Sequence, residues 1–246
     1  MEYNPYALTG KTILVTGASS GIGRAVAIEC SRLGAHVILS ARNKEKLEET
    51  LKMMEGHGHQ VIECDLSKEK EVSLLIDEIQ GLVNNAGTTM TVPVPFIKFN
   101  VLSDLLKVNT IAPIMILSGL VKKKKLRANS SVVFTSSVSG LGRVSPGNTM
   151  YAATKGAVST FVMGAAKELA SKGIRVNAVC PGMTETDIMS HLAASEEQLE
   201  EDRKTFPLKR YGKPEEIAWA IIYLLSDASA WVTGTNLLID GGRCLK

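Results

Sequence analysis

The chain has little of what marks nucleic-acid-binding, metal-binding or membrane-spanning proteins. Its 28 Lys and Arg residues barely outnumber its 25 Asp and Glu residues, and a formal net charge of +3 gives no reason to expect a nucleic-acid partner. Four cysteines and four histidines form neither a Cys-x-x-Cys pair nor a zinc-ligand spacing, so we expect no metal site and the reduced thiols of a cytoplasmic protein. No apolar run reaches the ~18 residues of a membrane span, and the first residues lack the apolar core of a signal peptide. These absences predict a soluble globular protein with no membrane partner.

Short apolar or β-branched runs alternate along the chain with longer helical patterns. The runs that read as strands are residues 12–16, 36–40, 60–64, 81–84, 131–135, 174–179 and 236–240. Helical patterns follow the first three strands, at residues 22–33, 44–54 and 68–80. Nearly continuous apolar strands in such an alternation are typical of a parallel sheet covered on both faces. The sequence therefore predicts a single doubly wound α/β domain of the Rossmann type over residues 1–246, with about seven strands.

One polar stretch, residues 187–213, interrupts this alternation. It is acidic first and then basic, and it is long for a connection within a compact domain. We interpret it as a helical lid over the substrate site. A merely solvated helical face is an equally good interpretation.

A glycine-rich turn, Thr-Gly-Ala-Ser-Ser-Gly-Ile-Gly at residues 16–23, joins the first strand to the first helix. Such a turn brings backbone N–H groups and the positive end of a helix to a pyrophosphate. Gly17 permits the tight turn, Gly21 lets the phosphate approach, and Gly23 allows close helix–strand packing. A glycine triplet alone is weak evidence, but its place directly after the first strand favours a dinucleotide site.

The end of the second strand distinguishes between the two nicotinamide cofactors. An acidic residue there would accept the ribose hydroxyls of NAD, whereas this chain has Ala41 followed by Arg42. A guanidinium suits a phosphate dianion in charge and geometry, so NADP(H) is the predicted cofactor. Asp65, just after the third strand, is placed to meet the adenine.

Tyr151 and Lys155 are four residues apart and so share one face of a helix. A free phenol has a pKa of about 10, and a nearby ammonium would lower it toward a useful range. Ser137, which follows the fifth strand, could hydrogen-bond a substrate carbonyl oxygen as charge develops on it. Each residue alone is unremarkable, because a helical Tyr is often core and a Lys often surface.

Together these features resemble the short-chain dehydrogenase/reductase family over nearly the whole chain. The motifs that match are the turn at residues 16–23, Asn-Asn-Ala-Gly at 84–87, Lys-Val-Asn ending at Asn109, Ser137, Tyr-x-x-x-Lys at 151–155, Pro181-Gly182 and the ending at 233–242. The resemblance implies that Tyr151 is the general acid, that Ser137 orients the carbonyl, and that Lys155 lowers the Tyr151 pKa. Asn109 would then hold the water that relays protons to Lys155.

The same resemblance implies a set of residues around the cofactor. They are Thr16, Gly17, Ser19, Ser20, Gly21, Ile22, Gly23, Arg42, Asp65, Leu66, Asn85, Ala86, Gly87, Tyr151, Lys155, Pro181, Gly182, Thr184 and Thr186. Two places depart from the family pattern. Thr184 stands where an Ile is common, and residues 76–84 are short, either because the junction is trimmed or because a segment is absent from the sequence.

Within the family the pattern most resembles the β-ketoacyl–acyl carrier protein reductases, which meet an acidic carrier with basic residues near the active-site entrance. The matching positions are Lys124, Lys125, Arg127 and Lys172, although basic helix ends are common for other reasons. The residues expected around the substrate are Leu141, Arg143, Val144, Pro146 and Met150. This largely apolar set favours NADPH-dependent reduction of a 3-oxoacyl thioester, free or carrier-linked.

Two other functions stay open at this point. One is oxidation or reduction of a sugar, polyol or steroid-like alcohol, and the other is a nucleotide-binding sensor without catalysis. The intact set of Asn109, Ser137, Tyr151 and Lys155 argues against the sensor, which would need no tuned phenol.

The helix that carries Tyr151 is apolar almost all round. The residues beyond its catalytic face are Ala153, Gly156, Ala157, Phe161, Val162, Gly164, Ala165 and Ala166. Such a helix is buried on both sides, so we expect a partner subunit. The family resemblance implies a homotetramer.

Overall fold

A computed structural model describes residues 3–75, 77–186 and 195–245. These residues form a seven-stranded sheet in the order β3-β2-β1-β4-β5-β6-β7, and every pairing is parallel. The strands are β1 (Thr12–Thr16), β2 (His36–Ala41), β3 (Gln60–Glu63), β4 (Ile79–Asn84), β5 (Leu126–Thr135), β6 (Arg175–Pro181) and β7 (Asn236–Ile239). The predicted doubly wound α/β fold is confirmed.

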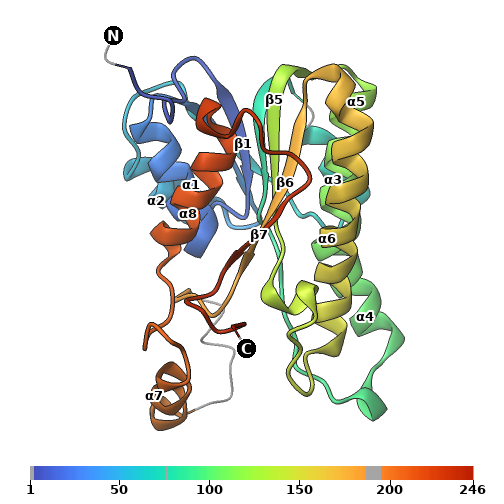
Figure 1. The fold of residues 1–246 in the computed structure, drawn as a ribbon. Coiled ribbons are helices and arrows are strands. Elements are labelled where there is room, and N and C mark those ends of the chain that lie inside the picture. Colours follow the sequence, from blue (N-terminus) through green and yellow to red (C-terminus); the bar gives the residue numbers. More distant parts are fainter. Residues whose placement is uncertain (1–2, 76, 187–194, 246) are drawn as a thin grey trace.

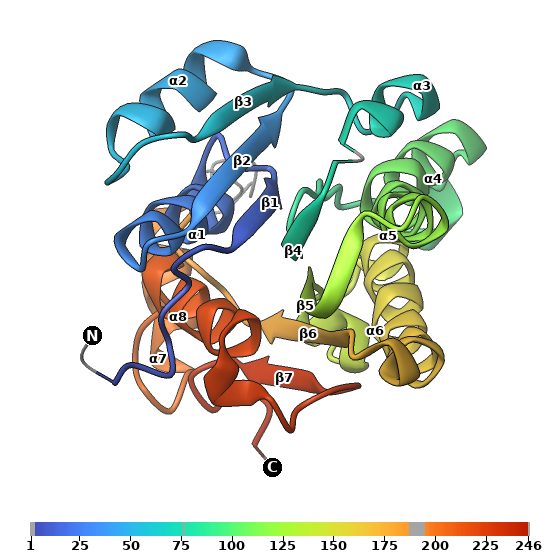
Figure 2. The ribbon, with the colours of Figure 1, turned by 90° about the horizontal axis from the view of Figure 1, so that it is seen from above.

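Helices cover both faces of the sheet (Figure 1; Figure 2). They are α1 (Gly21–Arg32), α2 (Lys44–Lys52), α3 (Glu69–Val72), α4 (Phe99–Leu106), α5 (Ala112–Lys122), α6 (Thr149–Leu169), α7 (Glu196–Lys204) and α8 (Pro214–Leu225). Successive side chains of β1 face opposite sides of the sheet, which shows how the two helical layers form. Ile13 and Val15 join the core cluster under α1 and α8, and Leu14 joins the cluster under α5 and α6.

The strand order fixes where a ligand can bind. The chain runs outward from β1 toward β3, then returns to the centre at β4 and runs outward toward β7. The carboxyl ends of β1 and β4 therefore flank the point at which the winding reverses. In open α/β sheets that point is where ligands bind.

The predicted helix over residues 68–80 is wrong. The helix α3 ends at Val72, a 3₁₀ turn follows over Ser73–Leu75, and β4 already begins at Ile79. Tertiary pairing overrides helical pattern here, because the Ile79 N–H donates to the carbonyl of Lys125 at 2.9 Å and the strand continues beside β5. Only a few residues therefore separate α3 from β4 in this chain.

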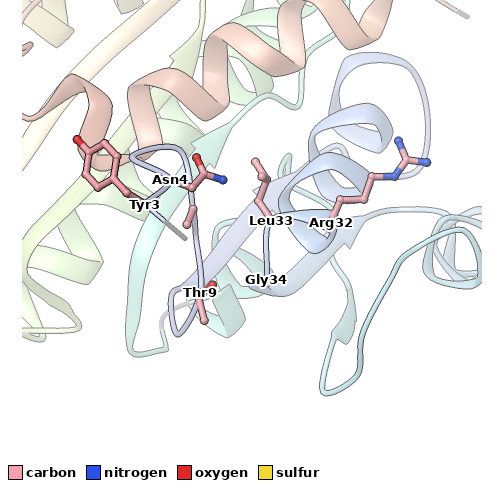
Figure 3. Close-up of a pocket in the computed structure, with 7 residues that line it drawn as sticks. Tyr3, Asn4, Thr9, Arg32, Leu33 and Gly34 are labelled. Carbon is pink, nitrogen blue, oxygen red and sulfur yellow. The ribbon is translucent and has the colours of Figure 1, made fainter. Parts of the chain in front are cut away.

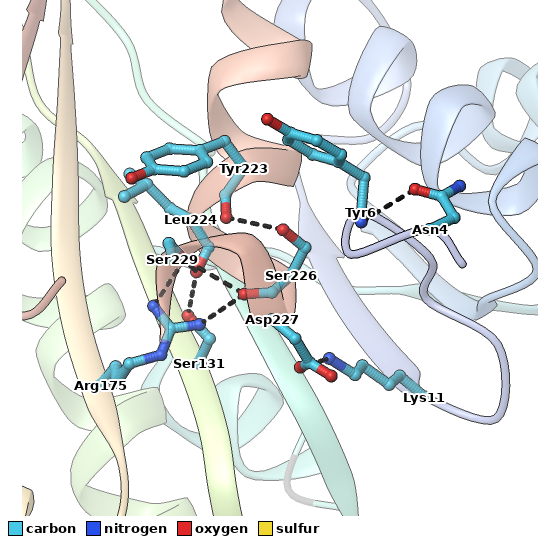
Figure 4. A network of polar contacts seen from close by, with 10 residues as sticks. All are labelled: Asn4, Tyr6, Lys11, Ser131, Arg175, Tyr223, Leu224, Ser226, Asp227 and Ser229. Carbon is cyan, nitrogen blue, oxygen red and sulfur yellow. Dashed lines mark hydrogen bonds and ion pairs between the residues drawn. The ribbon is translucent and has the colours of Figure 1, made fainter. Parts of the chain in front are cut away.

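A polar network ties α8 to the amino edge of the sheet (Figure 4). Arg175 at the start of β6 donates to the Ser229 hydroxyl at 2.8 Å and to the Ser226 carbonyl at 3.1 Å. The Ser131 hydroxyl of β5 donates to the carbonyl of Leu224 at 2.6 Å. These bonds satisfy the last carbonyls of α8 and hold the helix on the sheet.

One continuous helical stretch in the described part of the chain, Phe99–Lys122, is long and apolar enough by length and composition alone to cross a membrane. Its residues Ile116, Leu117 and Leu120 are buried in the core cluster under α5 and α6. One face of the stretch therefore packs into the core of the domain.

Candidate active site

The glycine-rich turn is closed against the end of β4. Gly17 and Gly21 have φ of +69° and +53°, where a side chain would be strained. A Cβ built on Gly23 would lie 2.2 Å from the Gly17 carbonyl oxygen, and one on Gly17 would lie 2.9 Å from Ala86 Cα. The helix α1 then begins at Gly21, and within the described residues the Ser20 side chain does not cap it. The first N–H groups of α1 therefore point toward the turn, which is the arrangement that binds an anion at a helix N-terminus.

Asn85 and Thr16 join the ends of three strands. The Thr16 hydroxyl accepts from the N–H groups of Asn85 at 3.0 Å and Ala86 at 3.1 Å. The Asn85 amide donates to the Thr16 carbonyl at 3.2 Å and accepts from the Thr135 hydroxyl at 3.3 Å. Among the predicted cofactor residues, Asn85 is thus engaged in fixing the turn between β1, β4 and β5.

The residues predicted to meet the adenosine half lie at the ends of β2 and β3. Arg42 is exposed directly after β2. The N–H and hydroxyl of Ser67 hold the pKa of Asp65 below its usual value, and the charges of Lys68 and Arg42 add to this effect. Leu66 instead packs partly buried against the core. Arg42 and Asp65 therefore share one edge of the expected cofactor groove.

The predicted catalytic residues converge at the carboxyl end of β5. Lys155 is buried and its Nζ donates to the Thr135 carbonyl at 2.7 Å. The Lys155 Nζ and the Asn109 Oδ1 both flank Gly87, since a Cβ there would lie 3.3 Å and 3.4 Å from them. The Ser137 hydroxyl lies near enough to the Tyr151 phenol to lower the pKa of that phenol, and it accepts from the Ser139 N–H at 3.1 Å.

The pKa of Tyr151 is raised rather than lowered in this structure. Burial raises it, and the neighbouring Ser137 hydroxyl offsets the rise only in part. Lys155 does not lower it as predicted, because its ammonium is directed at the Thr135 carbonyl and lies 5.8 Å from the phenol ring centre. Burial lowers the pKa of Lys155 itself to about 8, against a smaller opposing effect of Cys180. The phenol is therefore protonated at neutral pH and able to donate.

Asn109 lies in a π-helical turn, Lys107–Ile111, between α4 and α5. Its side chain accepts from the Thr88 N–H at 2.9 Å and donates to the Thr88 carbonyl at 2.9 Å and the Thr154 hydroxyl at 3.1 Å. Single-turn π segments are frequent at functional sites. Thr88 and Thr154 were not predicted, and only their places beside the Asn-Asn-Ala-Gly and Tyr-x-x-x-Lys motifs could have indicated them.

The segment after β6 lies over the glycine-rich turn. A Cβ on Gly21 would lie 3.1 Å from the Thr186 methyl group. The Gly182 N–H donates to the Ile239 carbonyl at 2.8 Å, which fixes Pro181 and Gly182 to the end of β7. Thr184 is buried and bridges Gly212. Thr186 thus lies against the glycine-rich turn.

The basic residues predicted near the active-site entrance are at the opposite edge of the sheet. Lys124, Lys125 and Arg127 flank the start of β5, and Lys172 precedes β6, whereas Tyr151 and Ser137 lie beyond the carboxyl ends. Parallel strands begin at one edge, and the ten residues of β5 span roughly 30 Å. Arg127 also pairs with Glu78, and Lys125 lies 4.0 Å from Asp77. Within one chain these residues do not border the site.

A surface hollow also lies at that opposite edge (Figure 3). It is lined by the N-terminal segment and by the end of α1, through Tyr3, Asn4, Ala7, Thr9, Arg32, Leu33 and Gly34. The strands begin at that end of the sheet, whereas the catalytic residues lie at the carboxyl ends. The hollow is therefore remote from the catalytic residues.

The expected substrate residues differ in exposure. Leu141 and Val144 are 42% and 44% exposed beside the site, but Met150 is 2% exposed and packs inward. Arg143 donates to the Cys244 carbonyl at 2.6 Å. Met150 is therefore not part of the accessible surface, because it lies in the first turn of α6 where that helix packs against the domain.

Fold and site together define a nucleotide-binding oxidoreductase. A family model described as Enoyl-(Acyl carrier protein) reductase matches residues 17–243. A 3-oxoacyl-[acyl-carrier-protein] reductase FabG of Thermotoga maritima is 38% identical over 244 residues, covering 96% of this chain and 98% of that protein. The corresponding FabG of Rickettsia felis is 34% identical and covers 97% and 98%.

Solved structures agree with this assignment. A candidate 2-deoxy-D-gluconate 3-dehydrogenase from Agrobacterium tumefaciens, with bound NADP, has a TM-score of 0.92 at 29% identity and covers 99% of this chain and 100% of that one. A short chain dehydrogenase from Burkholderia cenocepacia in complex with NADP has a TM-score of 0.88 at 28% identity, with 98% and 99% covered. The chain belongs to the short-chain dehydrogenase/reductase family and is an oxidoreductase.

Proposed function

We propose that the protein reduces a carbonyl group to a secondary alcohol with NADPH, and that the carbonyl belongs to a 3-oxoacyl thioester, free or carrier-linked. The observation that carries the proposal is the convergence of the Ser137 hydroxyl, the Tyr151 phenol and the Lys155 ammonium at one end of β5. The similar FabG proteins, named as 3-oxoacyl-[acyl-carrier-protein] reductases, support the substrate class.

The residues present fit a nicotinamide dinucleotide. The absent side chains of Gly17 and Gly23 leave room that a Cβ would fill with backbone clashes, and the amino end of α1 offers N–H groups to a pyrophosphate. Residues 84–87 and 181–186 would enclose the rest of the dinucleotide. When bound, the cofactor supplies the hydride that is added to the carbonyl carbon.

The protein's own groups handle the oxygen and the proton. Ser137 would hydrogen-bond the carbonyl oxygen, which stabilises the negative charge that develops on it. Tyr151 would donate its proton to that oxygen, and its raised pKa keeps the proton in place until it is needed. Lys155 and Asn109, which both flank Gly87, would return a proton to the phenol through water.

Preference for NADP(H) over NAD(H) is part of the proposal. The end of β2 has Ala41 in place of an acid, and exposed Arg42 follows. Arg42→Ala should weaken NADPH binding at least about tenfold, because one charge-assisted phosphate contact is lost, while NADH binding stays nearly unchanged. Lys52→Ala, at the far end of α2, is the matched control. Equal losses for the two cofactors would contradict the preference.

A second candidate substrate is a sugar or polyol. The similar structure from Agrobacterium tumefaciens is described as a candidate 2-deoxy-D-gluconate 3-dehydrogenase. Exposed Leu141 and Val144 favour the acyl ketone instead. A panel of 3-oxoacyl thioesters, sugar acids and hydrophobic ketones, followed by NADPH consumption, separates the two. Turnover of sugar acids alone would overturn the thioester assignment.

The exposed apolar faces support the proposed homotetramer. In a single chain one face of α6 leaves Ala153, Ala157, Met163 and Gly164 exposed, although its other face is core. Elsewhere in the described chain Trp231 is fully exposed and Trp219 is 56% exposed. The apolar face of α6 and these exposed tryptophans suit contacts between subunits.

We also propose a cytoplasmic location and a lid. The four cysteines are free, as expected in a reducing compartment. Residues 187–194 of the expected lid lie outside the described part of the chain. Its remainder holds α7 and a small buried pair, Phe206 and Tyr211, and the lid function of residues 187–213 stays a proposal.

A further inference from the structure

The last described residues form an ordered turn after β7. The Asp240 carboxylate accepts from the Gly242 N–H at 2.9 Å and from the Cys244 N–H at 2.7 Å. The N–H of Leu245 donates to the Gly242 carbonyl at 3.0 Å. We call residues 240–245 the C-terminal turn.

One side of the C-terminal turn contacts the loop between Ser137 and Tyr151. Arg143 of this loop donates from its guanidinium to the Cys244 carbonyl at 2.6 Å. The guanidinium is thus held by the chain's own C-terminal backbone. A loop of eleven residues, 138–148, is anchored there between the two catalytic residues that it connects.

The other side of the C-terminal turn contacts α7 and the chain after it. Arg243 pairs with Asp202 of α7 at 3.3 Å, donates to the Thr205 hydroxyl, and lies 4.9 Å from the ring centre of Phe206. Asp202 in turn accepts from the hydroxyl of Tyr211 at 3.0 Å. Phe206 and Tyr211 are 2% and 1% exposed and pack edge to face.

The helix α7 needs such a contact, because it has no core of its own. None of its described residues is buried, and a nine-residue helix is marginal without tertiary packing. In Figure 1 the red C-terminal segment lies between the orange chain that follows α7 and the yellow-green loop after β5. The C-terminal turn is therefore the contact that joins these two elements.

We propose that the C-terminal turn fixes the position of residues 138–148 relative to α7, and that Arg143 and Arg243 are positioning residues for ketone binding. The proposal rests on the proposed function for the location of the ketone, beside Ser137 and Tyr151. Both arginines act on the substrate through the turn, because their guanidinium groups are directed at it or at α7.

Steady-state kinetics provides the first test. Arg143→Ala and Arg243→Ala should each raise the KM for the ketone about tenfold, since each removes charge-assisted bonds, while kcat and the KM for NADPH change less than about twofold. The double variant should resemble the single variants, because either change already releases the turn. Arg143→Lys should recover part of the loss. Arg32→Ala, an exposed arginine at the opposite edge, is the control.

If the increases in the KM for the ketone multiply in the double variant, the proposal is refuted, because the two arginines would then act through independent contacts. An unchanged KM for the ketone in both single variants would refute it too.

A second test needs no substrate. Hydrogen exchange of the free protein should accelerate in α7 for Arg143→Ala and in residues 138–148 for Arg243→Ala, although neither arginine belongs to the element that responds. If each variant accelerates exchange only in its own neighbourhood, the C-terminal turn does not join the two elements. If the cross effect is found and no ketone is turned over, the proposed function fails and the positioning role stands.

Discussion

Replacing Lys155 by methionine should change how the protein's stability depends on pH. Lys155 is 4% exposed, and burial lowers its pKa from 10.5 to about 8. In the unfolded chain the side chain regains its ordinary pKa. Between pH 8 and 10.5 the unfolded state therefore binds more protons than the folded state, so the free energy of unfolding rises with pH across this window.

The magnitude follows from the size of the pKa difference. At about 1.4 kcal/mol per pH unit, a fall from 10.5 to about 8 costs the folded protein about 3 kcal/mol below pH 8. That cost disappears by pH 10.5. Methionine fills a similar volume without a charge, but it leaves the Thr135 carbonyl without its 2.7 Å donor, a loss of about 1–3 kcal/mol at any pH. The two effects nearly cancel at neutral pH, so the slope is the decisive quantity.

The assay is urea unfolding of the cofactor-free protein at fixed concentration from pH 7 to 10. The wild-type protein should gain about 2.5 kcal/mol relative to Lys155→Met between pH 7 and pH 10. All other titrating groups are common to both proteins and cancel in the difference. Lys167→Met, on the exposed face of the same helix, is the matched control and should show no such change. Parallel stability curves for wild type and Lys155→Met would refute the claim that burial lowers the pKa of Lys155.

Two further predictions concern the cofactor turn and the assembly. Gly23→Ala places a Cβ 2.2 Å from the Gly17 carbonyl oxygen, so the turn must distort. NADPH binding, measured by fluorescence titration, should weaken by about 1–3 kcal/mol. Unchanged affinity would show that the turn does not hold the cofactor. Trp231→Asp replaces a fully exposed tryptophan and should weaken subunit association at least about tenfold in analytical ultracentrifugation, whereas an unchanged mass at the lowest concentration would exclude this surface from the assembly.

Local chemistry made much of the fold and site predictable. The apolar runs of β1 and β2, the glycines at positions 17 and 23, and the spacing of Tyr151 and Lys155 each satisfy a short-range requirement that can be read directly. The helix over 68–80 failed because β4 recruits Ile79 into the sheet through long-range pairing with β5.

The wrong predictions for the site also concern contacts between residues that are far apart in the chain. Whether Arg127 lies near Tyr151 depends on whether each residue is at the amino or the carboxyl end of the parallel strands. Arg143 is held by a residue 101 positions away in the chain. The direction of the Tyr151 pKa depends on burial and on where the Lys155 ammonium is directed. The spacing of residues along a helix determines neither.

Proton donation by Tyr151 is the central claim, and Tyr151→Phe tests it most directly. The variant keeps the ring and removes only the hydroxyl, and Tyr6→Phe at an exposed position serves as its control. NADPH affinity and turnover of the best ketone should be measured on the same preparation. If Tyr151 donates the proton, the variant should keep nearly unchanged NADPH affinity and lose turnover at least about a hundredfold. Turnover close to that of the wild-type protein would contradict it.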